Sequence, residues 1–200
     1  MKRFILPAIA VALTLSQPAS ADEYGLSIYG GTMGSSDIET SRKQTYALDN
    51  DSHLGLSIDK YVPEGRYGLY YSKTETALSD YPTRKVEMEY LLFQSAAMSP
   101  ITENLTGYFG AQLGINRLSP NFIESDTFFA SGLYAGLEYN LGAGFHIGTE
   151  ARWIATILKN NSKVTCDLDP ETDNTCSWHF DNEIMSQYQA SLTLSYQFSL

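Results

Sequence analysis

The chain has 200 residues, of which 23 are acidic and 13 basic, so its formal net charge is −10. This length suits a single domain. The acidic balance lacks the positive surface that a protein needs to bind a phosphate backbone, so we expect no nucleic-acid partner. The mean hydropathy of −0.21 would suit an ordinary soluble protein. The arrangement of the apolar residues therefore has to decide the class.

Residues 1–21 predict a secretory signal peptide. Lys2 and Arg3 precede an apolar stretch over residues 4–15, and Ala19-Ser20-Ala21 supplies a small-residue cleavage site. This is the three-part pattern of such signals. The apolar stretch is shorter than the ~20 residues of a membrane-spanning helix. We expect cleavage after Ala21 and one exported domain over residues 22–200.

Eight strands with period-two alternation are predicted along the rest of the chain. In chain order they cover residues 23–33, 53–61, 66–74, 85–97, 105–117, 127–139, 145–157 and 183–200. The connections 62–65, 98–104 and 140–144 are short, whereas 34–52, 75–84, 118–126 and 158–182 are longer and polar. An even number of strands with short turns at one end and long loops at the other is typical of outer-membrane barrels with a periplasmic N-terminus.

The last strand gives the clearest signal for the membrane. From Ile184 to Leu200, mostly apolar residues hold the even positions and polar residues the odd ones. A soluble strand usually has five or six residues, whereas a tilted strand that crosses a bilayer needs about 9–11 and its extensions. The predicted fold is therefore all-β, an eight-stranded antiparallel up-and-down transmembrane β-barrel.

Along the predicted strands, one parity carries sets of apolar residues that no acid or base interrupts, as a lipid-facing surface requires. These residues are Leu26, Ile28, Leu54, Leu56, Ile58, Tyr67, Leu69, Tyr71, Val86, Met88, Tyr90, Leu92, Phe109, Ala111, Leu113, Ile115, Leu133, Ala135, Leu137, Tyr139, Phe145 and Ile147. Lys60 also takes this parity, which predicts a β-bulge or a side chain that reaches the headgroups. The alternative is a soluble periplasmic barrel or sandwich with this face turned inward. Such a protein usually covers its outer face with Lys and Glu, but the polar faces here are poor in Lys.

Aromatic residues of the lipid-facing parity gather at the periplasmic ends of the strands. They predict an interfacial girdle made of Tyr24, Tyr67, Tyr139, Phe145, Tyr196 and Phe198.

The opposite parity mixes small and polar residues with charges, and these can fill the narrow interior of an eight-stranded barrel. The predicted ion-pair network in this lumen consists of Asp59, Arg66, Glu87, Glu89, Glu138, Glu150 and Arg152, with His146 beside it. We expect Arg152 to reach Glu87 or Glu89, and Arg66 to lie near Asp59 and Glu138. Because an unpaired buried ion costs several kcal/mol, a closed lumen filled by ion pairs is favoured over a proton or ion path.

The chain resembles the small Gram-negative outer-membrane β-barrel proteins, the group of the OmpA transmembrane domain and OmpX. The most specific element is the C-terminal stretch 191–200, which looks like the strand signal read by the barrel-assembly machinery, with Tyr196, Phe198 and Leu200 on one face. Members usually end in Phe, whereas this chain ends in Leu200. The resemblance implies outer-membrane localisation, contact with lipid and lipopolysaccharide, and passage through periplasmic chaperones. A monomer is expected.

Cys166 and Cys176 lie close together in a hydrophilic segment and are expected to form a disulfide in an oxidising compartment. The segment between them carries acids at alternate positions, which raises the alternative of a calcium loop. The central Gly and the final Glu of such a loop are missing, so no metal or cofactor is expected.

Some barrels of this size modify lipid A, so a hydrolase is a second alternative. Such an enzyme needs a hydroxyl nucleophile, a histidine and an orienting acid. Lipid A deacylases carry the pattern His-x-Ser, in which Ser is the nucleophile. This chain has His146-Ile147-Gly148, with Gly at the position of that Ser. We therefore expect no catalytic residues. The favoured function is structural or surface interaction through the loops; the alternative is a narrow channel or lateral path like that of the OmpW-type proteins.

Overall fold

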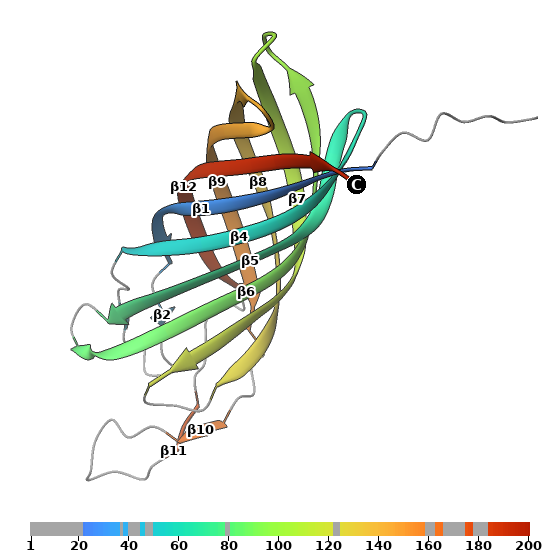
Figure 1. Ribbon diagram of the computed structural model, residues 1–200. Coiled ribbons are helices and arrows are strands. Elements are labelled where there is room, and N and C mark those ends of the chain that lie inside the picture. Colours follow the sequence, from blue (N-terminus) through green and yellow to red (C-terminus); the bar gives the residue numbers. More distant parts are fainter. Residues whose placement is uncertain are drawn as a thin grey trace, which may run out of the picture.

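The computed structural model describes residues 22–36, 38–39, 45–46, 50–78, 81–121, 125–158, 163–165, 175–177 and 184–200. The predicted signal peptide and most of the cysteine loop lie outside these residues. Eight long strands form one closed barrel (Figure 1). They are β1 (Glu23–Ser35), β4 (Asp51–Val62), β5 (Gly65–Leu78), β6 (Tyr81–Pro100), β7 (Leu105–Pro120), β8 (Asp126–Gly142), β9 (Phe145–Ile157) and β12 (Ile184–Ser199).

Every strand of the barrel is antiparallel to both neighbours, and strands that follow one another along the chain lie side by side. The barrel closes where β1 pairs with β12, from Glu23 opposite Ser199 to Ser35 opposite Gln187. The described end of the chain at Leu200 consequently lies beside the start of β1 (Figure 1). The prediction of an eight-stranded antiparallel up-and-down barrel is confirmed. Within the described residues, no helix is long and apolar enough to cross a bilayer.

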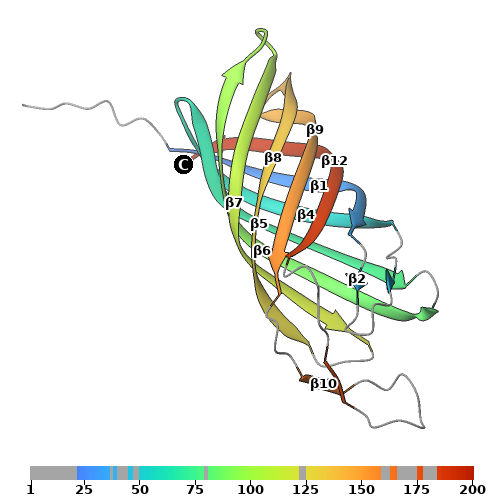
Figure 2. The same ribbon diagram turned by 180° about the vertical axis from the view of Figure 1, so that it is seen from behind.

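The two ends of the barrel differ in their connections. The turns after β4, β6 and β8 are tight; Gly142 and Gly144 have φ values of 90° and 81°, which L side chains rarely adopt. At the other end, two short hairpins extend from the loops: β2 (Ile38–Glu39) with β3 (Thr45–Tyr46), and β10 (Lys163–Thr165) with β11 (Thr175–Ser177). Both lie at the end opposite Leu200 (Figures 1 and 2). The sequence analysis missed these hairpins.

Burial alternates along the strands and separates a lipid-facing side from a lumen side. The predicted lipid-facing residues of β1, β4, β5, β7, β8 and β9 lie on the outer side. The prediction for β6 was wrong, because Val86, Met88, Tyr90 and Leu92 are buried inside the barrel. Leu91 and Phe93 face outward instead, as the pairing of Leu91 with outward-facing Tyr71 requires.

The loop-end half of the lumen combines a large apolar cluster with buried polar side chains, among them Asn116, Thr156 and Gln187. Buried side chains from six strands form one cluster there: Tyr29, Met33, Tyr70, Val86, Met88, Tyr90, Leu92, Ala130, Ile154, Leu158 and Met185. This filling explains the error on β6, since an apolar side chain there has an apolar partner on the inside as well as lipid on the outside. The turn-end half of the lumen is polar and holds the charged residues.

The predicted aromatic girdle lies at the turn end of the outer surface. Phe145 packs on Tyr196 with ring centroids 4.8 Å apart, and Tyr24 stacks on Phe198 at 6.2 Å. The pairing of β1 with β4 runs without a shift through Tyr24 and Lys60, so the predicted bulge is absent. Lys60 Nζ instead lies 2.7 Å from Asp22 Oδ2 at this rim, so its side chain reaches the interface.

A second set of outward aromatic residues lies toward the loop end, which the sequence analysis did not predict. It consists of Phe129, Trp153 and Tyr188. Together the two sets border an apolar band, as interfacial aromatics do on transmembrane barrels.

Candidate functional site in the lumen

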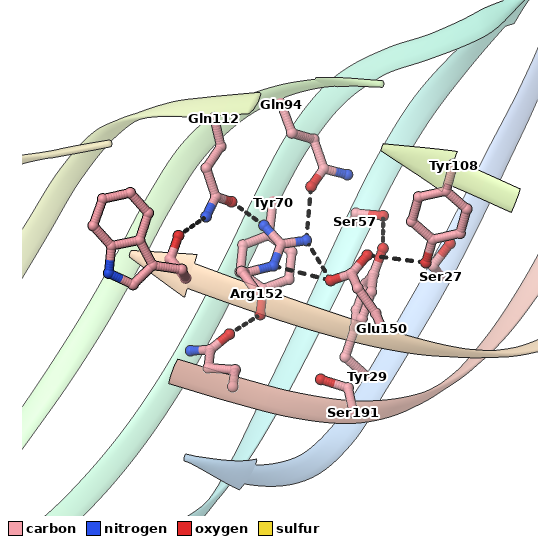
Figure 3. Close-up of polar contacts among 12 residues, drawn as sticks. Ser27, Tyr29, Ser57, Tyr70, Gln94, Tyr108, Gln112, Glu150, Arg152 and Ser191 are labelled. Carbon is pink, nitrogen blue, oxygen red and sulfur yellow. Dashed lines mark hydrogen bonds and ion pairs between the residues drawn. The ribbon is translucent and has the colours of Figure 1, made fainter. Parts of the chain in front are cut away.

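Arg152 lies at the centre of the lumen, between side chains of four strands (Figure 3). Its side chain on β9 is 1% exposed, and its Nε and Nη2 donate to Glu150 Oε1 at 2.9 and 2.7 Å. Nη2 also donates to Gln94 Oε1 of β6 at 3.0 Å, and Nη1 donates to Gln112 Oε1 of β7. The guanidinium lies 3.6 Å from the ring centroid of Tyr70 on β5. Arg152 therefore joins strands from opposite walls.

Both carboxylates near Arg152 have further hydrogen-bond donors. Tyr108 Oη donates to Glu150 Oε2 at 3.1 Å. Asp59 of β4 accepts from Gln94 Nε2 at 2.9 Å and from Ser57 Oγ at 2.7 Å. Gln94 thus links the Arg152 guanidinium to the Asp59 carboxylate. Such sharing offsets the desolvation of each buried charge.

A second ion pair closes the lumen nearer the turn end. Arg66 Nη1 donates to Glu138 Oε2 at 3.2 Å, with side chains 2% and 5% exposed. The Arg66 guanidinium also lies 4.2 Å from the ring centroid of Tyr108, and Gln197 Nε2 donates to Glu138 Oε1 at 3.4 Å. Tyr108 consequently contacts both ion-paired groups, Arg66 through its ring and Glu150 through its hydroxyl.

Tyrosine rings occupy space that glycines leave open in this part of the lumen. A Cβ atom on Gly136 would collide with the Tyr108 hydroxyl, and one on Gly110 would collide with the Tyr134 ring. Glycine at these two positions therefore leaves room for the two rings beside the arginines.

Two of the predicted network residues lie elsewhere. The prediction that Glu87 and Glu89 face the lumen was wrong, because both lie on the outer side of β6. Glu87 Oε1 is 2.7 Å from Lys73 Nζ, and Glu89 Oε1 is 3.8 Å from it. The observed partner of Arg152 is instead Glu150 on its own strand, two residues away. Asp59, Arg66, Glu138, Glu150, Arg152 and His146 are buried on the lumen side.

Sequence reasoning also missed the uncharged partners of the arginines and one histidine contact. Gln94, Gln112 and the tyrosines carry no pattern that marks them as ligands of an arginine. His53 Nε2 lies 2.9 Å from Ser191 Oγ, and both residues are buried. His53 Nδ1 has no hydrogen-bond partner in the described part of the chain, so this Ser–His contact there lacks the orienting carboxylate of a hydrolytic triad.

The remaining predicted sites are only partly described. Cys176 lies in β11 opposite Val164, whereas Cys166 and the acidic residues between the cysteines lie outside the described residues, so the disulfide stays a prediction. Among the residues described, no three His, Cys, Asp or Glu side chains are grouped as metal ligands. Tyr196 and Phe198 lie in β12 and Leu200 directly after it, at the end where an assembly signal is expected.

Among the comparisons with known proteins, the one with solved structures agrees with this architecture. No protein-family model matches the chain, and no curated protein matches its sequence. The structure is similar to that of Neisserial surface protein A (TM-score 0.59, 15% identity, 88% of this chain and 97% of that chain). It is also similar to the outer membrane protein OprG from Pseudomonas aeruginosa (TM-score 0.54, 14% identity, 90% and 97%). At these identities the likeness concerns the fold, and the chain has the fold of the small outer-membrane β-barrels.

Proposed function

We propose that the protein is an outer-membrane barrel with a closed lumen that acts as a structural scaffold and holds its long loops at the cell surface. The observation that carries this proposal is the filling of the lumen. Arg152 bridges opposite walls through Glu150, Gln94 and Gln112, and the apolar cluster together with buried polar side chains fills the half above it. A solute would have to displace both layers.

The layers oppose passage for different physical reasons. The polar layer is held by buried ion pairs, and removal of one partner leaves an uncompensated charge. The loop-end layer packs buried apolar side chains against buried Asn116, Thr156 and Gln187, so a permeating ion would exchange much of its hydration for contacts with apolar groups. Passage therefore requires rearrangement of both, which favours a scaffold over a diffusion pore.

The loops of such a scaffold can change in sequence without loss of stability of the barrel. The long connections all leave the end opposite the tight turns, and two of them contain the hairpins β2–β3 and β10–β11. Loops on a rigid frame commonly carry binding residues. We assign the surface interaction to this end and no catalytic role to the barrel.

The test replaces residues 36–50 and 159–183 separately by short Gly-containing turns and measures binding of whole cells that produce each variant to host-cell and bacterial surfaces. A matched control replaces the turn-end connection 101–104, which lies at the other end. We expect loss of binding with at least one loop replacement and none with the control. Unchanged binding in both loop variants, with the barrel folded, would contradict the interaction role.

The alternative function, a narrow channel or lateral path, predicts uptake. Swelling of proteoliposomes in small sugars or amino acids measures this directly. We expect proteoliposomes to swell no faster than liposomes without protein. Faster swelling that depends on the solute would favour the channel.

A further inference from the structure

Charged side chains gather on the outer wall of β5, β6 and β7, on the parity that faces lipid lower down. This outer-wall charge cluster consists of Lys73, Glu75, Lys85, Glu87, Glu89 and Arg117. It is continuous with the apolar band, since Tyr71 lies next to Lys73 on the outer face of β5 and Leu91 lies next to Glu89 on that of β6. Tyr71 Oη donates to Glu89 Oε1 at 3.0 Å, which joins the band to the cluster.

The depth of the cluster follows from strand pairing. Residues that lie directly opposite one another on successive strands form a row around the barrel. The row that begins at Lys60, by the girdle at the turn end, continues through Tyr67 and reaches Tyr188, near the loop end of β12. Rows therefore climb from β4 towards β12. With a spacing of ~4.8 Å and a tilt of about 40°, each strand along a row adds ~3 Å of height.

Lys73 pairs with Leu54, which lies six residues above Lys60 on β4. Six residues at ~3.3 Å each on a strand tilted by about 40° climb roughly 15 Å. Lys73 then lies about 18 Å above Lys60, and Glu89 and Arg117, which follow on the same row, lie at about 21 and 24 Å. The apolar band of a transmembrane barrel is about 25 Å tall. The cluster therefore lies at the outer headgroup level.

Within the described residues, the outward positions of β8, β9 and β12 at this level are uncharged. They are Phe129, Ile157, Tyr188 and Ile184. Among the described side chains, the bases outside the lumen and above the girdle are Lys73, Lys85 and Arg117, all within three adjacent strands. Because the charges gather in one sector and at one depth, we infer that this part of the outer wall contacts a charged partner, whereas the rest of the wall contacts lipid chains.

Two of these bases are available to a further anion. Arg117 is 59% exposed, and its Nη1 lies 4.0 Å from Glu89 Oε2, at the limit of an ion pair. Lys73 is 47% exposed, although it contacts both Glu87 and Glu89. Arg presents paired donors that match phosphate oxygens, and Lys supplies a point charge. Glu89 lies between the two bases and competes for both.

We propose that Lys73 and Arg117 bind a phosphate group on the headgroup of an outer-leaflet lipid, and that Glu89 limits the affinity by pairing with the same two bases. The proposal rests on the outer-membrane placement of the proposed function and names a lipid partner for one sector of the barrel. It needs no contribution from the loops.

The test measures binding of the full-length folded protein in nanodiscs to lipid A carrying its phosphates, to the same lipid dephosphorylated, and to inorganic phosphate alone. Basic residues at a membrane surface change affinity by about fivefold each. We therefore expect the double variant Lys73→Gln/Arg117→Gln to bind phosphorylated lipid A at least tenfold more weakly. The control Lys60→Gln, which removes one positive charge at the girdle, keeps the affinity within about twofold.

Glu89→Gln supplies a second test of opposite sign, because it removes the acid that Lys73 and Arg117 share, while Lys73 keeps its ion pair with Glu87; we expect affinity to rise by about fivefold. The slower migration of boiled protein in electrophoresis verifies that each variant was folded, independently of lipid binding or conductance. Equal binding of the two lipids, an unchanged affinity in the folded double variant, or weaker binding by Glu89→Gln would each overturn the proposal. Binding of inorganic phosphate alone with the same dependence on the variants would overturn the assignment to a lipid.

Discussion

Substitution of Arg152 by Met tests the lumen at its centre. The change keeps an unbranched apolar stem and removes every hydrogen bond that the guanidinium makes. Glu150, 1% exposed, keeps only the Tyr108 hydroxyl as a donor, and the carbonyl oxygens of Gln94 and Gln112 lose theirs. Removal of one partner from a buried ion pair typically costs about 3–5 kcal/mol. We expect the free energy of unfolding to fall by about that amount.

The assay is a urea titration of the barrel in phospholipid vesicles, with the folded fraction read from unboiled electrophoresis. The double variant Arg152→Met/Glu150→Gln removes both charges, so we expect it to recover at least half of the loss. The control Lys85→Met removes an exposed ion pair with Glu75, and the urea midpoint should not move. A loss below ~1 kcal/mol in the single variant, or no recovery in the double one, would refute an ion pair that stabilises the lumen.

Three further predictions concern the walls. Leu56→Arg puts a cation against lipid near mid-membrane and should lower the free energy of unfolding by ~2–4 kcal/mol in the same titration. Leu91→Cys should react with a lipid-soluble maleimide and Leu92→Cys should not, because the two side chains are 48% and 0% exposed. The reverse result would show that Leu92 and not Leu91 faces lipid. Phe145→Ala breaks the packing on Tyr196 and should cost about 0.5–1.5 kcal/mol beyond the lost area; an unchanged urea midpoint would contradict a stabilising girdle.

Much of the barrel could be predicted from the chain, because alternation and turn residues are local properties. The eight strands, the three tight turns and the girdle all follow from them. The face of β6 could not be assigned in this way, since residues 86–93 include apolar side chains of both parities. Only the pairing with β5, which places Leu91 beside Tyr71, decides which set meets lipid.

The site was predicted less completely than the fold. The lumen location of Arg66, Glu138, Glu150 and Arg152 followed from parity, which needs no long-range information. The partners of Arg152 did not, because Gln94 and Gln112 reach it across the lumen from strands 58 and 40 residues away. The spacing of Glu150 and Arg152, two residues apart on one face, was a local signal that could have identified their pairing.

Single-channel recording in planar bilayers tests the central claim, a lumen closed by its own side chains, most directly. Purified, folded protein should give no steady conductance across the voltage range in which the bilayer itself is stable. Reproducible channels of the intact protein, lost or altered on substitution of Arg152, would show that the lumen conducts and would contradict this account.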